Sequence, residues 1–252
     1  MAKAKDDRTA LVTGAGRRLG RIIALDLAAN GWRVGVHYRA SAPEAAGLVA
    51  EIERNGGKAA AFAADLDRLD ALPKLIADCA TALGAPSCLI NNAARFEPDT
   101  LATLDGATWQ AHLDVNLRTP VFLTQAFAGA LPDGVEGNVI NILDQKVLRL
   151  TPDYFSYTIA KAALWSATQT MAQALAPKIR VNAIAPGPVL KHEGQSRSDF
   201  ERECGATLLR RTVSADDVAG AVRFLLETPS ITGQLIALDS GQHLAFDQER
   251  GG

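Results

Sequence analysis

The feature that most constrains the fold is a regular alternation of short apolar runs with helix-length amphipathic segments along the chain. The runs are continuously apolar, as in parallel strands that are covered on both faces. Strand–helix–strand alternation predicts an α/β fold, with one doubly wound parallel sheet flanked by helices, as a single domain over residues 1–252. The predicted strands are Thr9–Val12, Arg33–His37, Ala59–Ala63, Cys88–Asn91, Val139–Leu143, Arg180–Ile184 and Leu235–Leu238.

The amphipathic segments give the predicted helices, and glycine or proline marks several of their ends. Gly31 and Gly56 stand where a left-handed C′ glycine closes a helix, and Pro177 ends a later one. The polar segment Lys191–Arg211 contains no clear strand, and we expect it to be a substrate loop. The predicted helices are Leu19–Asn30, Pro43–Asn55, Ala71–Leu83, Thr108–Gly129, Tyr157–Ala176 and Ala215–Glu227.

Composition and charge argue against several other classes of protein. Of the 252 residues, 48% are hydrophobic, and the net charge of −2 disfavours nucleic acid or an anionic membrane as the main partner. No apolar run could span a bilayer and the first residues show no apolar signal segment, so we expect a cytoplasmic protein. Cys79, Cys88 and Cys204 are scattered, as are the histidines, which argues against a metal site.

A glycine-rich loop, Thr13–Gly20, lies between the first predicted strand and the first predicted helix. Glycines there permit a tight turn and let a dinucleotide diphosphate approach the helix N-terminus. Two arginines in the loop also favour an anion, although an ordinary glycine turn is the alternative interpretation. The candidate cofactor-binding residues of the loop are Gly14, Gly16, Arg17, Arg18, Leu19 and Gly20.

The end of the second predicted strand favours NADP(H) over NAD(H). An NAD site usually carries Asp or Glu here for the ribose 2′-hydroxyl, whereas an arginine accommodates a 2′-phosphate. In this chain the first acid after the strand is Glu44, several residues on. We therefore predict that the cofactor contacts His37, Tyr38, Arg39 and Ser41, with a solvated surface arginine as the alternative for Arg39.

Tyr157 and Lys161 form the strongest catalytic pattern. Their spacing puts a phenol and an ammonium one helical turn apart on the same face. A nearby positive charge stabilises the phenolate, so we expect the pKa of Tyr157 to lie below its usual value of about 10. Tyr157 would then donate or accept a proton near neutral pH, as an oxidoreductase requires.

Taken together, these motifs resemble those of the short-chain dehydrogenase/reductase family over nearly the whole chain, and the resemblance implies a Rossmann-like fold. The matching elements occur in the order of the family. They are the loop Thr13–Gly20, Asp65-Leu66, Asn91-Asn92-Ala93, Asn116, Tyr157 with Lys161, and Pro186-Gly187.

The resemblance implies a role for each matching residue. Tyr157 would be the general acid in reduction, Lys161 would hold the nicotinamide ribose, and Asn116 would support a proton-relaying water. It also implies a homotetramer that reduces a small molecule. The further cofactor contacts that it implies are Asp65, Leu66, Asn92, Ala93, Tyr157, Lys161, Pro186, Gly187 and Val189.

Two departures from the family pattern narrow the substrate. Arg18 replaces a usual glycine, and Asp144 occupies the position of the usual catalytic serine, which donates a hydrogen bond to a substrate carbonyl. An ionised carboxylate has no proton to donate and repels charge developing on that oxygen. A C=N bond differs, because its nitrogen becomes more basic as hydride arrives. A structural Asp144 paired with Arg17, Arg18 or Lys146 is the alternative.

Both departures resemble the pteridine reductase branch of the family. The shared features are Arg18-Leu19-Gly20, His37-Tyr38, Asp144 and Phe96. In that branch the phenylalanine and the nicotinamide sandwich the flat pterin ring, and aromatic stacking adds about 0.5–1.5 kcal/mol beyond area burial. Ala94 stands where the branch often has serine, and plain packing is the alternative role for Phe96.

Three functions are therefore open from the sequence. The first is an NADPH-dependent reductase of a pterin C=N bond, which converts dihydropterin to tetrahydropterin, with dihydrofolate as a second candidate substrate. In it Asp144, Tyr157, Lys161 and Asn116 are catalytic, and Phe96, Asp144 and Tyr157 bind the substrate. The second is a carbonyl reductase acting on a ketone, a sugar or a 3-oxoacyl thioester. The third is a catalytically silent NADP(H)-binding regulator.

Overall fold

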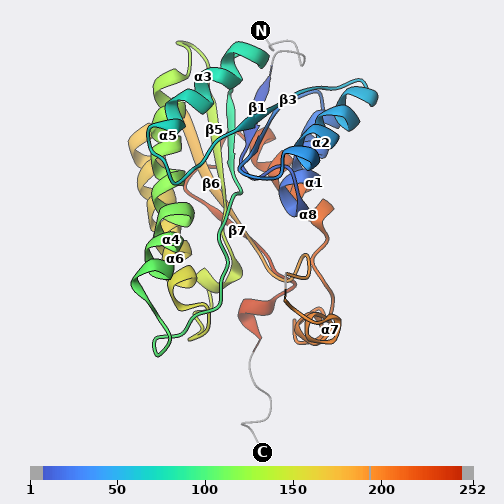
Figure 1. Ribbon diagram of the computed structural model, residues 1–252, viewed down its shortest axis with the longest axis vertical. Helices are drawn as coiled ribbons and strands as arrows, with labels where there is room; N and C mark the ends of the chain where they lie inside the picture. The colour runs from blue at the N-terminus through green and yellow to red at the C-terminus, as the bar shows by residue number, and fades with distance from the viewer. Residues whose placement is uncertain (1–7, 193, 246–252) are drawn as a thin grey trace, which may run out of the picture.

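A seven-stranded parallel sheet forms the centre of the computed structural model, which describes residues 8–192 and 194–245 (Figure 1). The strand order is β3-β2-β1-β4-β5-β6-β7, and each neighbouring pair runs parallel. The strands are β1 Thr9–Val12, β2 Arg33–Tyr38, β3 Lys58–Ala63, β4 Cys88–Asn91, β5 Gly137–Ile142, β6 Ile179–Pro186 and β7 Leu235–Leu238.

Helices cover both faces of this sheet and leave its strands buried between two apolar layers. The helices are α1 Arg18–Ala29, α2 Ala42–Arg54, α3 Ala71–Leu83, α4 Gly106–Leu113, α5 Thr119–Ala130, α6 Phe155–Leu175, α7 Arg197–Gly205 and α8 Ala215–Glu227. α1, α2 and α8 pack on one face through residues such as Ile23, Leu48 and Val222. α3, α5 and α6 lie on the other face, where Ile76 and Phe127 are buried.

The strand order reverses direction between β1 and β4, which lie side by side at the centre of the sheet. In a doubly wound sheet, connections on opposite faces diverge at such a switch point and open a crevice at the carboxyl ends of the strands. The loops that follow β1 and β4 carry the glycine-rich segment and Asn92, respectively. The topology therefore puts several predicted site residues at one edge.

The predicted strands and most of the predicted helices are confirmed, with ends that shift by at most two residues. Gly31 and Gly56 have φ of +80° and +82°, so both adopt the left-handed conformation expected of C′ glycines. The cysteines Cys79, Cys88 and Cys204 are unbridged. Within the described residues, no helix combines the length and apolarity needed to cross a membrane.

The predicted helix Thr108–Gly129 is helical throughout, but it is not one regular α-helix. The segment divides into α4, a π-helical turn at Asp114–Arg118 and α5. The wider turn contains Asn116, which is fully buried and binds the backbone of Arg95 through both atoms of its carboxamide. Single π-helical turns often occur at functional sites, where they reorient one side chain.

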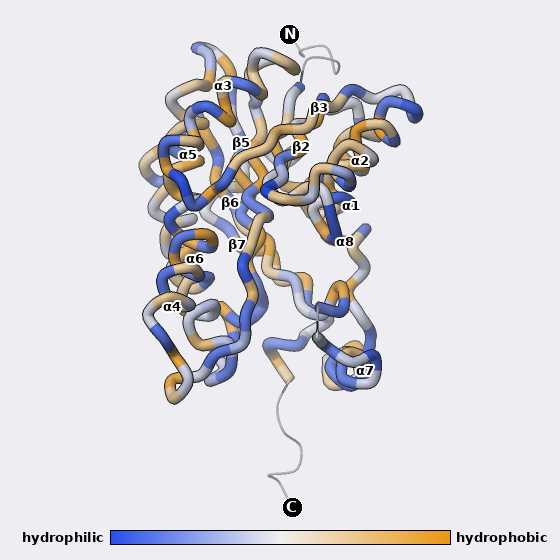
Figure 2. The backbone as a smooth tube through the Cα atoms, viewed as in Figure 1, coloured by the Kyte–Doolittle hydropathy of each residue, from blue (hydrophilic) through white to orange (hydrophobic). Residues whose placement is uncertain are grey.

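The segment Lys191–Arg211 contains a helix that the sequence analysis did not predict. α7 buries none of its residues and is largely hydrophilic (Figure 2). Ser196 caps it by accepting a hydrogen bond from the backbone of Asp199 (3.0 Å), and Arg197 and Glu201 form an ion pair across one turn. Because local polar contacts rather than an apolar stripe hold this helix, hydrophobic periodicity did not reveal it.

Candidate active site

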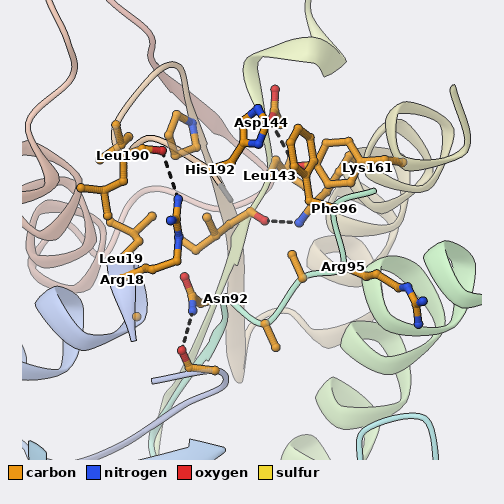
Figure 3. A pocket seen from close by; sticks show the side chains of 18 of the residues that line it. Arg18, Leu19, Asn92, Arg95, Phe96, Leu143, Asp144, Lys161, Leu190 and His192 are labelled. Atoms are coloured by element: carbon orange, nitrogen blue, oxygen red, sulfur yellow. Dashed lines mark hydrogen bonds between the residues drawn. The ribbon is translucent and has the colours of Figure 1, made fainter. Parts of the chain in front are cut away.

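A cavity of about 880 Å³ opens at the carboxyl ends of β1, β4, β5 and β6 (Figure 3). It brings together most of the predicted site residues, although these come from segments far apart in the sequence. Gly16, Tyr38, Ser41 and Asn116 do not line it. The predicted residues that do are Gly14, Arg17, Arg18, Leu19, Gly20, His37, Arg39, Asp65, Leu66, Asn92, Ala93, Phe96, Asp144, Tyr157, Lys161, Pro186, Gly187 and Val189.

The glycine-rich loop is packed so closely at Gly20 that a side chain would not fit there. A Cβ atom at Gly20 would lie 2.4 Å from the carbonyl oxygen of Gly14 and 2.5 Å from Nδ2 of Asn92. Asn92 fixes the loop by donating from Nδ2 to the carbonyl of Thr13 (2.9 Å), while Thr13 Oγ1 accepts from the backbone of Asn92 and Ala93. The loop therefore leaves the N-terminus of α1 open toward the cavity, as a diphosphate requires.

Arg18 occupies a loop position that usually carries glycine, and its side chain makes hydrogen bonds that a glycine could not make. Its φ is +53°, in the left-handed region that disfavours side chains and explains the usual glycine. Its guanidinium donates to the carbonyl oxygens of Lys191 (2.8 Å) and Leu190 (3.0 Å). The side chain thus joins the glycine-rich loop to the start of the predicted substrate loop.

His37 supports the same loop from beneath. It is buried, Nδ1 accepts a hydrogen bond from the backbone of Gly14 (3.1 Å), and Nε2 lies 3.1 Å from the carbonyl oxygen of Ala64. This arrangement requires the neutral ring with its proton on Nε2. Burial lowers the pKa of His37 to about 4, so the ring stays neutral at physiological pH.

The buried neutral His37 predicts an acid-sensitive fold. Between pH 6.5 and pH 4 the unfolded chain binds a proton at this histidine and the folded chain does not, so stability falls as pH falls. The expected loss is about 3 kcal/mol in the free energy of unfolding. Urea unfolding from pH 7 to pH 4 measures it. In His37→Asn, whose carboxamide cannot titrate, this part of the loss should disappear; an unchanged pH dependence would contradict the assignment.

Two exposed arginines lie among carboxylates at the end of the cavity beside β2. Arg39 lies at the end of β2, lines the cavity, and is 62% exposed, with Nη1 4.0 Å from Oδ2 of Asp67. Arg17 pairs with Glu44 across 2.5 Å. Exposed pairs of this kind are weak, so both guanidiniums remain available to a phosphate.

Asp144, Tyr157 and Lys161 converge at the other end of the cavity. The Tyr157 hydroxyl donates to Oδ2 of Asp144 (3.0 Å), and Oδ1 of Asp144 accepts from the backbone of Lys146 (2.8 Å). Nζ of Lys161 donates to the carbonyl oxygen of Ile142 (2.7 Å). Of the alternative partners of Asp144, Arg17 and Arg18 bond elsewhere, whereas Lys146 contacts the carboxylate through its backbone amide and lies near it as a charge.

The prediction that the pKa of Tyr157 lies below its usual value is wrong for this structure. Burial and the carboxylate of Asp144 raise the pKa of Tyr157 well above 10. Burial also raises the pKa of Asp144, against opposing contributions from Lys146, Tyr157 and Lys161. The pKa of Lys161 falls to about 8, because burial outweighs the attraction of Asp144. At neutral pH the phenol of Tyr157 therefore stays protonated and can donate a proton.

Phe96 lies in a cluster of aromatic rings beside Tyr157. Its ring stacks on Tyr154, with centroids 4.2 Å apart and planes at 9°, and meets Tyr157 edge-on at 4.7 Å. His192 approaches the same ring at 5.4 Å. The sequence analysis did not assign Tyr154 and His192 to the site. The spacing of Tyr154, one helical turn before Tyr157, was the available signal, whereas His192 had none.

Asn116 is connected to the site through its hydrogen bonds to the backbone of Arg95. Oδ1 accepts from the Arg95 amide (3.0 Å) and Nδ2 donates to the Arg95 carbonyl (2.9 Å), which fixes the residue before Phe96. Its proton-relay role stays a prediction. Among the described residues, no group of three or more His, Cys, Asp or Glu side chains is arranged to hold a metal ion.

Known proteins are similar to this chain along nearly its full length. A family model described as enoyl-(acyl carrier protein) reductase matches residues 14–243. The chain is 36% identical to a 3-oxoacyl-(acyl-carrier-protein) reductase of Synechocystis sp. over 93% of this chain and 96% of that protein. It is 30% identical to 3-oxoacyl-(acyl-carrier-protein) reductase FabG of Staphylococcus epidermidis, over 94% of this chain and 100% of that protein.

A solved structure has a still higher identity. It is the crystal structure of FolM Alternative dihydrofolate reductase 1 from Brucella canis complexed with NADP. The TM-score is 0.95 at 43% identity, and the match covers 99% of this chain and 100% of the other.

Proposed function

The chain belongs to the short-chain dehydrogenase/reductase family, and on that premise we propose that it is an NADPH-dependent reductase of a pterin C=N bond. The observation that carries this proposal is the carboxylate of Asp144, which accepts the Tyr157 hydroxyl at 3.0 Å beside the Phe96 ring. The similarity to FolM Alternative dihydrofolate reductase 1 supports the same substrate class. The reaction converts a dihydropterin to a tetrahydropterin.

The residues of the cavity suit NADPH. The diphosphate would be held at the N-terminus of α1, where Gly14 and Gly20 leave room and Arg17 supplies charge. Arg39 would bind the 2′-phosphate, and Asp65 would contact the adenine. Lys161 would hold the nicotinamide ribose. When bound, the cofactor supplies the hydride.

Tyr157 and Asp144 handle the proton that accompanies reduction. Hydride adds to the imine carbon of the substrate, the π pair of the C=N bond moves to the nitrogen, and this more basic nitrogen takes up the proton. The raised pKa of Tyr157 keeps the phenol protonated, so it remains a donor at neutral pH. Asp144 accepts a hydrogen bond from that hydroxyl at 3.0 Å and would orient the ring nitrogen beside it.

Phe96 provides the platform for the flat substrate ring. Tyr154 covers one face of Phe96, and the Tyr157 ring is nearly perpendicular to Phe96, at 81°. A pterin would stack on the other face of Phe96, with its C=N bond toward Tyr157. Tyr154 supports the Phe96 ring on the covered face. Offset stacking of a pterin on Phe96 would contribute about 0.5–1.5 kcal/mol beyond area burial.

The second candidate is a 3-oxoacyl thioester reductase. The names of the relatives from Synechocystis and Staphylococcus favour it. In this alternative Asp144 would have to be protonated to donate a hydrogen bond to the substrate carbonyl in place of the usual serine, and burial shifts its pKa in that direction.

Substrate turnover by the purified protein tests the proposal. NADPH oxidation is followed with dihydrobiopterin, dihydrofolate and an acetoacetyl thioester, and NADH serves as the cofactor control. We expect the pterin to be reduced with a higher kcat/KM than the thioester, and NADPH to be preferred over NADH. Turnover of the thioester alone would replace the proposed function with the second candidate.

A further inference from the structure

A buried polar cluster joins the loop that carries Phe96 to the helix that carries Tyr157. Its members are Asp99 after β4, His112 on α4, and Ser156 on α6, with exposures of 6%, 0% and 0%. Nδ1 of His112 lies 2.6 Å from Oγ of Ser156, and that oxygen bonds to Oδ2 of Asp99. None of the three side chains lines the large cavity.

The other side of the imidazole holds the loop. Nε2 of His112 accepts a hydrogen bond from the backbone amide of Glu97 at 3.2 Å. Glu97 directly follows Phe96, and Ser156 directly precedes Tyr157. The ring therefore bridges the residue beside the aromatic platform and the residue beside the catalytic phenol, and it lies 6.1 Å from the Tyr157 ring.

The hydrogen bonds of His112 to Glu97 and Ser156 require one protonation state of its ring. The Glu97 amide can only donate, so Nε2 must carry the lone pair and Nδ1 the proton. Nδ1 then donates to Ser156, and the Ser156 hydroxyl donates to Asp99. A second proton on the ring would set an N–H against the Glu97 N–H and break the contact.

We propose that neutral His112 is a positioning residue, which fixes the Phe96 loop against the catalytic helix and so sets the affinity for a stacked substrate. The assignment rests on the proposed function, because Phe96 matters to substrate only if a flat ring stacks there. His112 touches neither the cavity nor Asp144, so it acts through the backbone of Glu97 and through Ser156.

The charges around the ring agree with a neutral state at physiological pH. Burial is the largest influence and lowers the pKa of His112 below 6.5. The carboxylates of Asp99 and Glu97 favour the cation, and the guanidinium of Arg95 opposes it. From α6, the face toward the ring is that of the neutral phenol Tyr157. Acidification therefore loosens the bridge, whereas neutral solutions preserve it.

Steady-state kinetics of two variants test the inference. His112→Phe fills the space without an acceptor, whereas His112→Gln can accept from Glu97 and donate to Ser156 but cannot titrate. We expect His112→Phe to raise the KM for dihydrobiopterin about 10-fold with a smaller change in kcat and an unaltered dissociation constant for NADPH. His112→Gln should restore a KM near that of the wild type. Equal KM values in all three proteins would overturn the inference.

The pH profile and hydrogen exchange complete the test. On acidification from pH 7.5, the KM should rise more in the wild type than in His112→Gln, because only the wild type has a titratable ring at position 112. Amide exchange over residues 95–99 should be faster in His112→Phe than in His112→Gln, and this readout needs no substrate. Faster exchange in a protein that does not reduce pterins would retain the positioning role and refute the proposed function. Unchanged exchange would refute the positioning role itself.

Discussion

Replacing Tyr157 with phenylalanine is expected to lower kcat for reduction by about 10²- to 10⁴-fold, the usual contribution of a positioned proton donor. The hydroxyl is the group that contacts Asp144, whereas the ring packs against Phe96 and is conserved in the variant. NADPH binding should therefore persist. Stopped-flow measurement of NADPH oxidation, with cofactor titration by fluorescence, separates the two effects.

Tyr154→Phe is the matched control for this variant. Tyr154 also stacks on Phe96, but no hydrogen bond joins its hydroxyl to Asp144. Removal of the Tyr154 hydroxyl should change kcat only a few-fold. Equal losses in the two variants would mean that the Tyr157 hydroxyl is not the proton donor.

Replacing Gly20 with alanine is expected to damage the cofactor site severely. The new Cβ would lie 2.4 Å from the Gly14 carbonyl oxygen and 2.5 Å from Asn92 Nδ2, so the glycine-rich loop must move. Overpacking of this kind costs about 1–3 kcal/mol in stability, and a displacement of about 1 Å can lower kcat/KM on the order of 100-fold. Thermal unfolding and NADPH titration measure the two consequences.

Gly47→Ala provides the control for a glycine without close neighbours. Gly47 lies on the exposed side of α2, and a Cβ there meets no atom within 4 Å. Alanine is the better helix former, so this variant should gain about 0.5–1 kcal/mol in stability and keep its affinity for NADPH. If Gly20→Ala behaved like Gly47→Ala, the close packing of the loop would not matter for binding.

The sheet could be predicted because its strands are continuous apolar runs separated by helices with glycine or proline at their ends. Two features of the helices could not be predicted. The π-helical turn around Asn116 depends on a contact with Arg95, 21 residues away. α7 is held by a serine cap and by the Arg197–Glu201 ion pair, and so lacks the apolar period that reveals a buried helix.

Most of the residues predicted from local motifs do line the cavity, but their electrostatics could not be predicted. The spacing of Tyr157 and Lys161 put a positive charge near the phenol, which suggested a lowered pKa. In the structure Lys161 donates to the Ile142 carbonyl, while Asp144 accepts a hydrogen bond from the Tyr157 hydroxyl. Burial is the largest influence on the pKa of each of the three groups. Desolvation depends on the whole fold, so no local spacing reveals it.

The structural roles of Asn92 and His37 also could not be predicted from local sequence patterns. Each was predicted to contact the cofactor, and each lies at the cavity. Each also holds the glycine-rich loop through the backbone, Asn92 at Thr13 and His37 at Gly14. These hydrogen bonds join residues that are more than 20 positions apart, and only the folded sheet brings them together.

Substrate preference in Asp144→Ser tests the central claim most directly, because the claim is that a carboxylate beside Tyr157 selects a C=N substrate. The measurement is kcat/KM with NADPH for dihydrobiopterin and for an acetoacetyl thioester, in the wild type and in the variant. We expect the pterin-to-thioester ratio to exceed one in the wild type and to fall at least about 10-fold in Asp144→Ser, as the serine donates to a carbonyl but cannot share the nitrogen's proton. An unchanged ratio would contradict the account.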